Sequence, residues 1–167
     1  MPPPLPQDPV ALAHRHWVER GWSDAADGMA LVTSIMRIQQ ELLSRIDAEL
    51  QSFRLTFARY EVLMLLEFTR KGQLPLGKIG ERLQVHPASV TNVVQRLSDD
   101  GYLRRVPHPD DRRSTLASIT PTGSRTARAA TEHLNRHVFS TLPLDPADQI
   151  WINDMLATVR HAFGDFT

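Results

Sequence analysis

Residues 76–106, which read LGKIGERLQVHPASVTNVVQRLSDDGYLRRV, decide the fold of this chain. Apolar residues recur at helical spacing in both halves of the stretch, at Ile79 and Leu83 in the first and at Val90, Val94 and Leu97 in the second. Pro87 suits the first position of the second helix, where its missing N–H costs little, and Gly101 marks the end of that helix. The stretch therefore predicts two helices, at about 76–83 and 87–100, joined by a tight turn.

The second predicted helix carries a polar face opposite its apolar one. Hydroxyl, amide and guanidinium groups line this face, at Ser89, Thr91, Asn92, Gln95 and Arg96. Such groups can hydrogen-bond to base edges and phosphates in a DNA major groove. An ordinary helical hairpin with a solvated polar face is the alternative that these residues alone leave open.

Two short apolar stretches, 102–106 and 116–119, flank the polar loop HPDDRRS and predict a small two-stranded hairpin. Arg112 and Arg113 lie at its tip, where a two-stranded arm can carry them into a minor groove. Asp111 can hold a neighbouring guanidinium in one rotamer through two hydrogen bonds. Taken alone, the loop is equally compatible with a solvated turn of mixed charge.

Helical periodicity extends over the rest of the chain, at about 9–20, 24–52, 57–71, 121–140 and 147–163. The long helix has two apolar stripes and the last helix has one, which is more apolar surface than a single small domain covers. We therefore expect a two-fold symmetric homodimer. One compact domain per chain is predicted, in three parts: 1–52 with a leader, an added helix and a long dimerisation helix; 53–120 as the DNA-binding region; and 121–167 with C-terminal dimerisation helices.

Composition excludes several classes of protein. The formal net charge is zero, but residues 70–128 hold eleven Lys and Arg against five Asp and Glu, as expected where one part of a chain meets phosphates. No cysteine is present, so disulfides, thiolate metal sites and thiol sensing are excluded. No membrane span, signal peptide, phosphate-binding glycine loop or nucleophile motif is found, which predicts a cytoplasmic, nucleoid-associated protein that is not an enzyme.

Residues 55–123 resemble the multiple-antibiotic-resistance regulator (MarR) family of winged-helix repressors. The matching residues are Gly101, Leu103-Arg104-Arg105, Asp111-Arg112-Arg113, Ile119-Thr120-Pro121 and Gly123. The resemblance implies a mainly α-helical winged helix-turn-helix with a two-stranded β wing, and a homodimer that binds palindromic double-stranded DNA as a sequence-specific transcription regulator.

The same resemblance assigns roles to individual residues. Arg113 would enter the minor groove, Asp111 would orient it, and Arg112 would lie close to the DNA backbone. The recognition helix would hold Pro87, Ser89, Thr91, Asn92, Gln95 and Arg96. Arg104 and Arg105 are compatible with phosphate contacts or with salt bridges at the strand edge.

A small aromatic or carboxylic acid effector is also implied by the family. The added N-terminal helix is similar to that of a subset of the family that senses urate-like or carboxylate ligands. Trp17 and Glu61 are the nearest counterparts of the ligand residues of that subset. The subset, however, has aspartate in place of Glu61 and a ligand-binding arginine where Val93 stands. Arg59 could pair with an acidic ligand. The alternatives are that Trp17 packs in the core and that Arg59 forms a salt bridge with Glu61 or Asp47.

Two other functions remain open from the sequence. His133 and His137 lie four residues apart on one helix face, a spacing that suits zinc and that some family members use to sense it, whereas solvent-facing histidines are the simpler interpretation. A winged helix can also serve as a protein-interaction module without DNA binding. We expect no cofactor and no resident metal.

Overall fold

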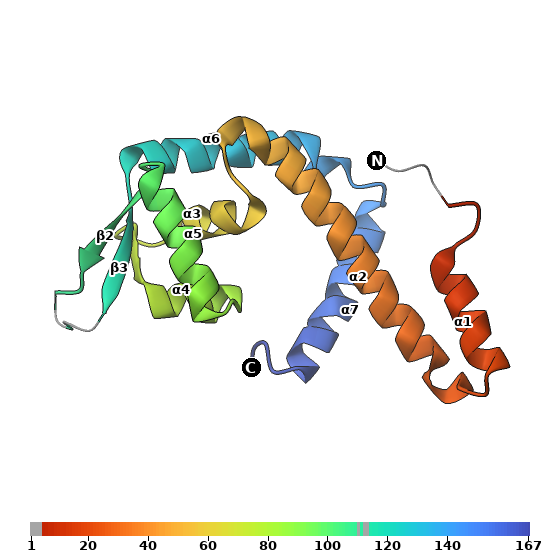
Figure 1. The fold of residues 1–167 in the computed structure, drawn as a ribbon. Helices are drawn as coiled ribbons and strands as arrows, with labels where there is room; N and C mark the ends of the chain where they lie inside the picture. Colours follow the sequence, from red (N-terminus) through yellow and green to blue (C-terminus); the bar gives the residue numbers. More distant parts are fainter. Residues whose placement is uncertain (1–4, 110, 112–113) are drawn as a thin grey trace.

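The computed structural model describes residues 5–109, 111 and 114–167 (Figure 1). The helices are α1 (Pro9–Glu19), α2 (Ser23–Leu50), α3 (Phe57–Glu67), α4 (Leu76–Leu83), α5 (Pro87–Asp99), α6 (Pro121–His137) and α7 (Pro146–Ala162), with short 3-10 turns at Gln51–Phe53 and Phe139–Thr141. The strands are β1 (Gln73–Pro75), β2 (Leu103–Pro107) and β3 (Thr115–Ile119). The predicted class, mainly helical with a small β wing, is confirmed.

A winged lobe, defined here as residues 55–123, holds α3, α4, α5 and the sheet and is attached to the C-terminal end of the long helix α2 (Figure 1). The outer helices are α1, residues 23–45 of α2, and α7. Helix α1 lies along the first part of α2, while α6 runs from the lobe back to the end of α2. No helix in the described part of the chain is long and apolar enough to cross a membrane.

The hydrophobic core lies where the lobe, α6 and the last turns of α2 meet. Leu50, Leu63, Leu66, Ile79, Leu97, Leu103 and Leu134 are all essentially inaccessible to solvent. Of the predicted inward residues, Ile79, Val90, Val94 and Leu97 are buried, and Leu83 is partly buried against the same core. The helical spacing of residues 76–99 therefore does join α4 and α5 through one face each. The polar side of α5 consequently faces outward.

The sheet has three strands, whereas the sequence analysis predicted two. Strand β1 pairs antiparallel with β3, with Gln73 opposite Ser118 and Pro75 opposite Leu116, so the order is β1-β3-β2. The Gln73 side-chain amide also donates to Ser118 Oγ at 3.1 Å. A three-residue strand is too short to show alternation, and only its tertiary partner β3 makes it a strand.

Helix α3 ends four residues earlier than its predicted end at residue 71. The Thr69 hydroxyl donates to the Leu66 carbonyl at 2.7 Å and accepts from the Gln73 backbone N–H at 3.0 Å. One side chain thus stops the helix and begins the strand. Helix α6 likewise ends at His137, where Arg45 of α2 donates to the His137 carbonyl at 3.0 Å.

The start of α6 is packed tightly against the segment that follows α5. The Thr120 hydroxyl accepts from the Gly123 backbone N–H at 3.0 Å and donates to the Gly101 carbonyl at 2.8 Å. A Cβ on Gly123 would collide with the backbone carbonyl of Tyr102. Glycine is therefore required at this contact, and the family-like Thr-Pro-x-Gly run joins α6 to the segment that follows α5.

Candidate nucleic-acid interface

Helix α5 presents a row of polar side chains to solvent. Ser89, Thr91, Asn92, Gln95 and Arg96 are all exposed, as is Pro87 at the first helical position. Because Val90, Val94 and Leu97 hold the opposite face in the core, the helix cannot rotate about its axis without exposing apolar surface. The polar face is thus presented in a fixed orientation.

Local hydrogen bonds set the chemistry at the beginning of α5. His86 caps the helix, its ring Nδ1 accepting from the Ala88 backbone N–H at 3.2 Å. The Thr91 hydroxyl donates to the Pro87 carbonyl at 3.0 Å. The hydroxyl proton is therefore used within the helix, and Thr91 exposes an acceptor oxygen and a methyl group to solvent.

Gln95 is held between two neighbours that the sequence analysis did not place there. Its side-chain amide donates to Asp99 Oδ1 at 2.8 Å, and its oxygen accepts from Arg105 Nη1 of β2 at 3.2 Å. The four-residue spacing of Gln95 and Asp99 on one helix was a usable signal. The contact of Arg105 depends on how the strand lies beside the helix.

The wing extends from β2 and β3. Asp111 lies in the turn between the strands, where its backbone carbonyl accepts from the Ser114 N–H at 3.0 Å, and the His108 N–H donates to the Ser114 carbonyl at 3.2 Å. Arg112 and Arg113, named above as wing-tip contacts, lie outside the described residues. Their DNA contacts and the orienting role of Asp111 therefore stay predictions.

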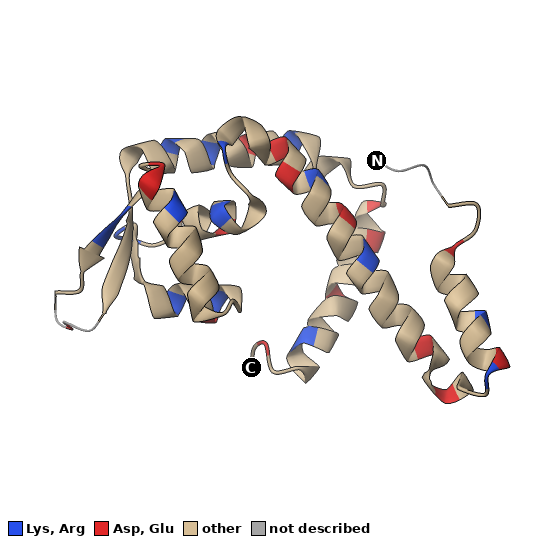
Figure 2. Ribbon diagram, in the orientation of Figure 1, with Lys and Arg blue, Asp and Glu red and all other residues tan. Residues whose placement is uncertain are grey.

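Basic side chains gather on the winged lobe. Figure 2 shows Lys and Arg on α4, α5 and β2, with acidic residues at the end of α5, and both signs of charge along α2. A hollow of about 630 Å³ lies between the end of α5, β2 and the start of α6, and Arg104, Arg105 and Thr122 are among its lining residues. This distribution agrees with the excess of positive charge between residues 70 and 128.

The residues suggested as effector ligands are not brought together within one chain. Trp17 packs edge-to-face on Trp22 with ring centroids 5.3 Å apart, on α1, which lies away from α3 (Figure 1). Glu61 is half-buried, and its burial raises its pKa above the ordinary value of 4.5. Arg59 pairs with Asp100, at 3.4 Å from Nη1 to Oδ2, rather than with Glu61 or Asp47.

The two histidines on α6 are neighbours, with ring centroids 4.3 Å apart. His133 Nε2 lies 2.7 Å from Glu49 Oε2, and its ring also packs edge-to-face on Phe53. Within residues 5–109, 111 and 114–167, no group of three His, Asp or Glu side chains is arranged to hold a metal ion. The His133 ring is therefore accounted for by a contact between α2 and α6.

Comparison with known proteins agrees with this architecture. The sequence profile of the MarR family matches residues 55–115. The chain is 47% identical to Sco5413, a MarR family transcriptional regulator from Streptomyces coelicolor, with a TM-score of 0.78 over 84% of this chain and 98% of that one. It is 27% identical to the uncharacterised HTH-type transcriptional regulator Mb0904 of Mycobacterium bovis, over 86% of each chain.

A third likeness is to Sco3205, a MarR family regulator of Streptomyces coelicolor solved in complex with DNA. The identity is 20% and the TM-score 0.71, over 82% of this chain and 88% of that one, so this likeness shows the fold alone. The winged lobe with its outward polar helix, the profile match over that lobe and the 47% identity across nearly all of Sco5413 lead to one conclusion. This chain belongs to the MarR family of transcriptional regulators, and it is not an enzyme.

Proposed function

We propose that the protein is a homodimeric repressor that binds a palindromic DNA operator and releases it when a small aromatic or carboxylic acid binds. The observation that carries the proposal is the exposed polar face of α5, held outward by the buried Val90, Val94 and Leu97. An exposed helix of this kind fits a major groove, where amide and hydroxyl groups distinguish base pairs. The adjacent wing would reach the flanking minor groove with Arg113, oriented by Asp111.

The outer helices support the homodimer. Neither α1 nor α7 has a buried residue, and α2 and α7 expose large apolar side chains that include Val32, Met36, Trp151, Met155 and Leu156. A second copy of the chain would cover these faces, and a two-fold axis would place two α5 helices on one face of the DNA. The operator would then have half-sites about one helical turn, or roughly 10 bp, apart.

Selection of operators from random DNA tests the proposal. The selected sites should be palindromic, and Asn92→Ala should weaken binding to them by about 1–3 kcal/mol while relaxing the preference at one base pair of each half-site. Asn135→Ala is the matched control, because it removes the same exposed amide from α6, away from α5. If Asn92→Ala keeps both the affinity and the preference of the unaltered protein, α5 does not read the bases.

Substitutions in the wing should change DNA binding in a different way from substitutions on α5. Arg113→Ala should weaken binding by about 1–3 kcal/mol and flatten its dependence on salt, with little change in base preference outside the flanks. Asp111→Ala should reproduce part of that loss although it removes a negative charge. Tighter binding by Asp111→Ala would show that the carboxylate only repels DNA.

The effector is proposed to act where the lobe meets the outer helices. The supporting observations are Arg59 at that junction and the half-buried Glu61 on the same helix, while Trp17 would have to approach from the second copy. Because the sequence has no cysteine, thiol oxidation is not available as the signal. An active acid should quench tryptophan fluorescence and release the selected operator over the same concentration range. If a broad panel of such acids changes neither signal, the effector proposal fails.

A further inference from the structure

The connection between α2 and the winged lobe is short and sharply bent. After the 3-10 turn Gln51–Phe53, Arg54 adopts a left-handed conformation with φ 58°, which non-glycine residues rarely take. The Leu55 N–H then reaches back to the Leu50 carbonyl at 3.2 Å. Residues 51–54, called the connecting segment here, therefore set the direction in which the lobe leaves the long helix.

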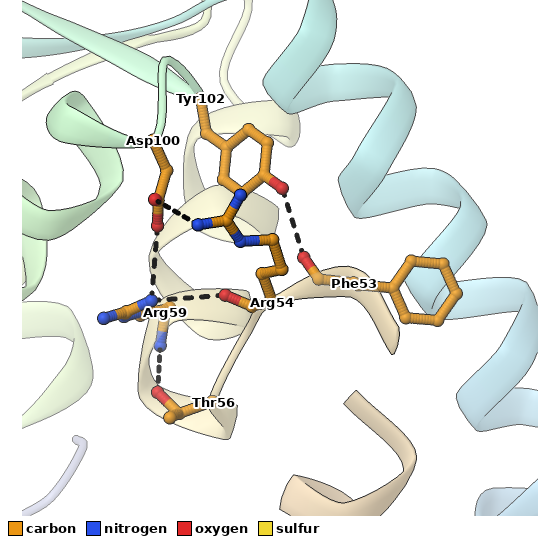
Figure 3. Close-up of polar contacts among 6 residues, drawn as sticks. All are labelled: Phe53, Arg54, Thr56, Arg59, Asp100 and Tyr102. Carbon is orange, nitrogen blue, oxygen red and sulfur yellow. Dashed lines mark hydrogen bonds and ion pairs between the residues drawn. The ribbon is translucent and has the colours of Figure 1, made fainter. Parts of the chain in front are cut away.

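The C-terminal end of α5 is fastened to this connecting segment by a charged contact (Figure 3). Asp100 Oδ2 lies 3.4 Å from Arg59 Nη1, and the same Nη1 donates to the Arg54 carbonyl at 3.2 Å. The Asp100 and Arg59 side chains are only 22% and 17% exposed, so water screens this pair less than a surface pair. Arg54 adds an outer contact, its Nη2 lying 3.8 Å from Asp100 Oδ1, but its side chain is 80% exposed.

A second fastening lies two residues further on. The Tyr102 hydroxyl donates to the Phe53 carbonyl at 3.2 Å, so side chains on both sides of Gly101 reach neighbouring residues of the connecting segment (Figure 3). In the sequence, Asp100 lies 41 positions from Arg59 and 46 from Arg54, and Tyr102 lies 49 positions from Phe53. Neither contact involves the exposed polar face of α5. Two independent bonds at one end of a rigid helix restrict its tilt as well as its position.

The geometry points to Asp100, with Arg59 and Tyr102, as the residue that fixes the angle of the recognition helix against the long helix. Asp100 is a positioning residue: it acts through the connecting segment and leaves base reading to the outward face. The inference rests on the proposed function in one respect. In a dimer built on α2, this angle sets the separation of the two α5 helices and hence the half-site spacing the protein accepts.

The first test measures that separation without DNA. Because the sequence has no cysteine, Ser89→Cys gives one spin-label site on α5 of each chain, and pulsed electron paramagnetic resonance reports the distance across the dimer. Asp100→Asn and Tyr102→Phe, each added to Ser89→Cys, should broaden or shift this distance, whereas Asp100→Glu should largely restore it. An unchanged, narrow distance in both variants would overturn the inference.

Glu67→Gln is the matched control. It breaks the ion pair between Glu67 of α3 and Arg128 of α6, which also joins two helices at the lobe but does not touch the connecting segment. The control should leave the distance unchanged. If Glu67→Gln broadens the distance as much as Asp100→Asn does, general loosening of the lobe explains the result, and the positioning role is wrong. Tyr102→Phe keeps the ring in place and removes a single hydrogen bond, so it covers the case in which Asp100→Asn fails to fold.

The second test uses operators whose half-sites are moved apart or together by one base pair. The preference of the unaltered protein for its selected spacing should fall by roughly 5-fold or more in Asp100→Asn, with the base preference inside each half-site unchanged. Equal loss of affinity at every spacing would reduce Asp100 to a structural residue and overturn the inference. If the distances change as expected but the unaltered protein selects no two-part operator, the proposed function fails while the positioning of α5 by Asp100 stands.

Discussion

The winged lobe and the outer helices differ in how they satisfy their apolar side chains. The lobe buries its apolar side chains together with α6 and the end of α2, with Leu63, Leu66 and Leu97 fully buried. Helices α3, α5 and α6 begin with side-chain caps. Helices α1 and α7 have no buried residue, and Trp151 of α7 is 64% exposed. The lobe, with α6 and the end of α2, therefore closes a core within one chain, whereas the outer helices leave apolar side chains exposed, where the proposed second copy would cover them.

The long helix α2 belongs to both regions. Ile46 and Leu50 in its last turns are buried in the core, whereas Leu31, Val32 and Met36 in its first half are exposed. A single helix thus spans two environments, and it continues directly into the connecting segment. The comparison explains why its apolar pattern is wider than one core needs.

The largest effect is expected in the core of the lobe. Leu63→Ala removes a fully buried side chain from α3 and should lower the free energy of unfolding by about 2–5 kcal/mol, because it loses apolar burial and leaves a cavity. Chemical denaturation followed by circular dichroism measures this loss. A change smaller than that of an exposed substitution such as Asn135→Ala would mean that α3 is not packed into this core.

The second effect concerns the outer helices. Trp151→Ala combined with Met155→Ala removes two exposed apolar side chains from α7 and should weaken dimerisation by about 2 kcal/mol or more, since buried aromatic anchors dominate interfaces. Sedimentation equilibrium measures the dissociation constant, with Asn153→Ala as a polar control on the same helix. If the double variant dimerises as tightly as the unaltered protein, the partner covers another face.

A smaller effect is expected at the junction of the lobe with α6. Thr120→Ala removes the N-terminal cap of α6 and the bonds of the hydroxyl to the Gly101 and Tyr102 carbonyls, and it should cost about 1 kcal/mol of stability. Thr122→Ala, two residues on and exposed, is the control for thermal unfolding. Equal melting temperatures for the two variants would show that the cap contributes nothing.

The smallest effects are two opposite dependences of folding stability on pH, which arise from Glu67 and Glu61 of α3. The Ser124 hydroxyl, and then Arg128, lower the pKa of Glu67 below 4.5, so its contribution to stability is present above about pH 4.5 and is lost as the pH falls through the lowered value. Burial raises the pKa of Glu61, so the folded state loses stability as the pH rises above 4.5 towards the raised value. Glu67→Gln should flatten the first slope and Glu61→Gln the second, in unfolding free energies measured across acidic pH. Slopes of the same sign for the two residues would contradict these assignments.

Local chemistry explains which parts of the fold were predictable. The α4–α5 unit followed from apolar spacing, Pro87 and Gly101, and the predicted exposed face of α5 is confirmed. The third strand and the early ends of α3 and α6 depend on partners such as Thr69 and Arg45, whose effects appear only once distant segments meet. Arg59 illustrates the same limit, since its partner Asp100 lies 41 positions away and nothing in the sequence marks the pair.

The close approach of Gly123 to Tyr102 has a consequence for building hybrid regulators. A 13-residue recognition helix is an attractive cassette to exchange between relatives with different operators. Here, however, the segment just after α5 lies so close to the start of α6 that a Cβ at Gly123 has no room. Asp100 also pairs with Arg59 of α3 and with Arg54 of the connecting segment. A helix transplanted alone would bring its reading face without the surfaces that hold it. The unit to exchange runs from residue 54 to residue 123, and we expect hybrids cut at those two positions to retain donor specificity.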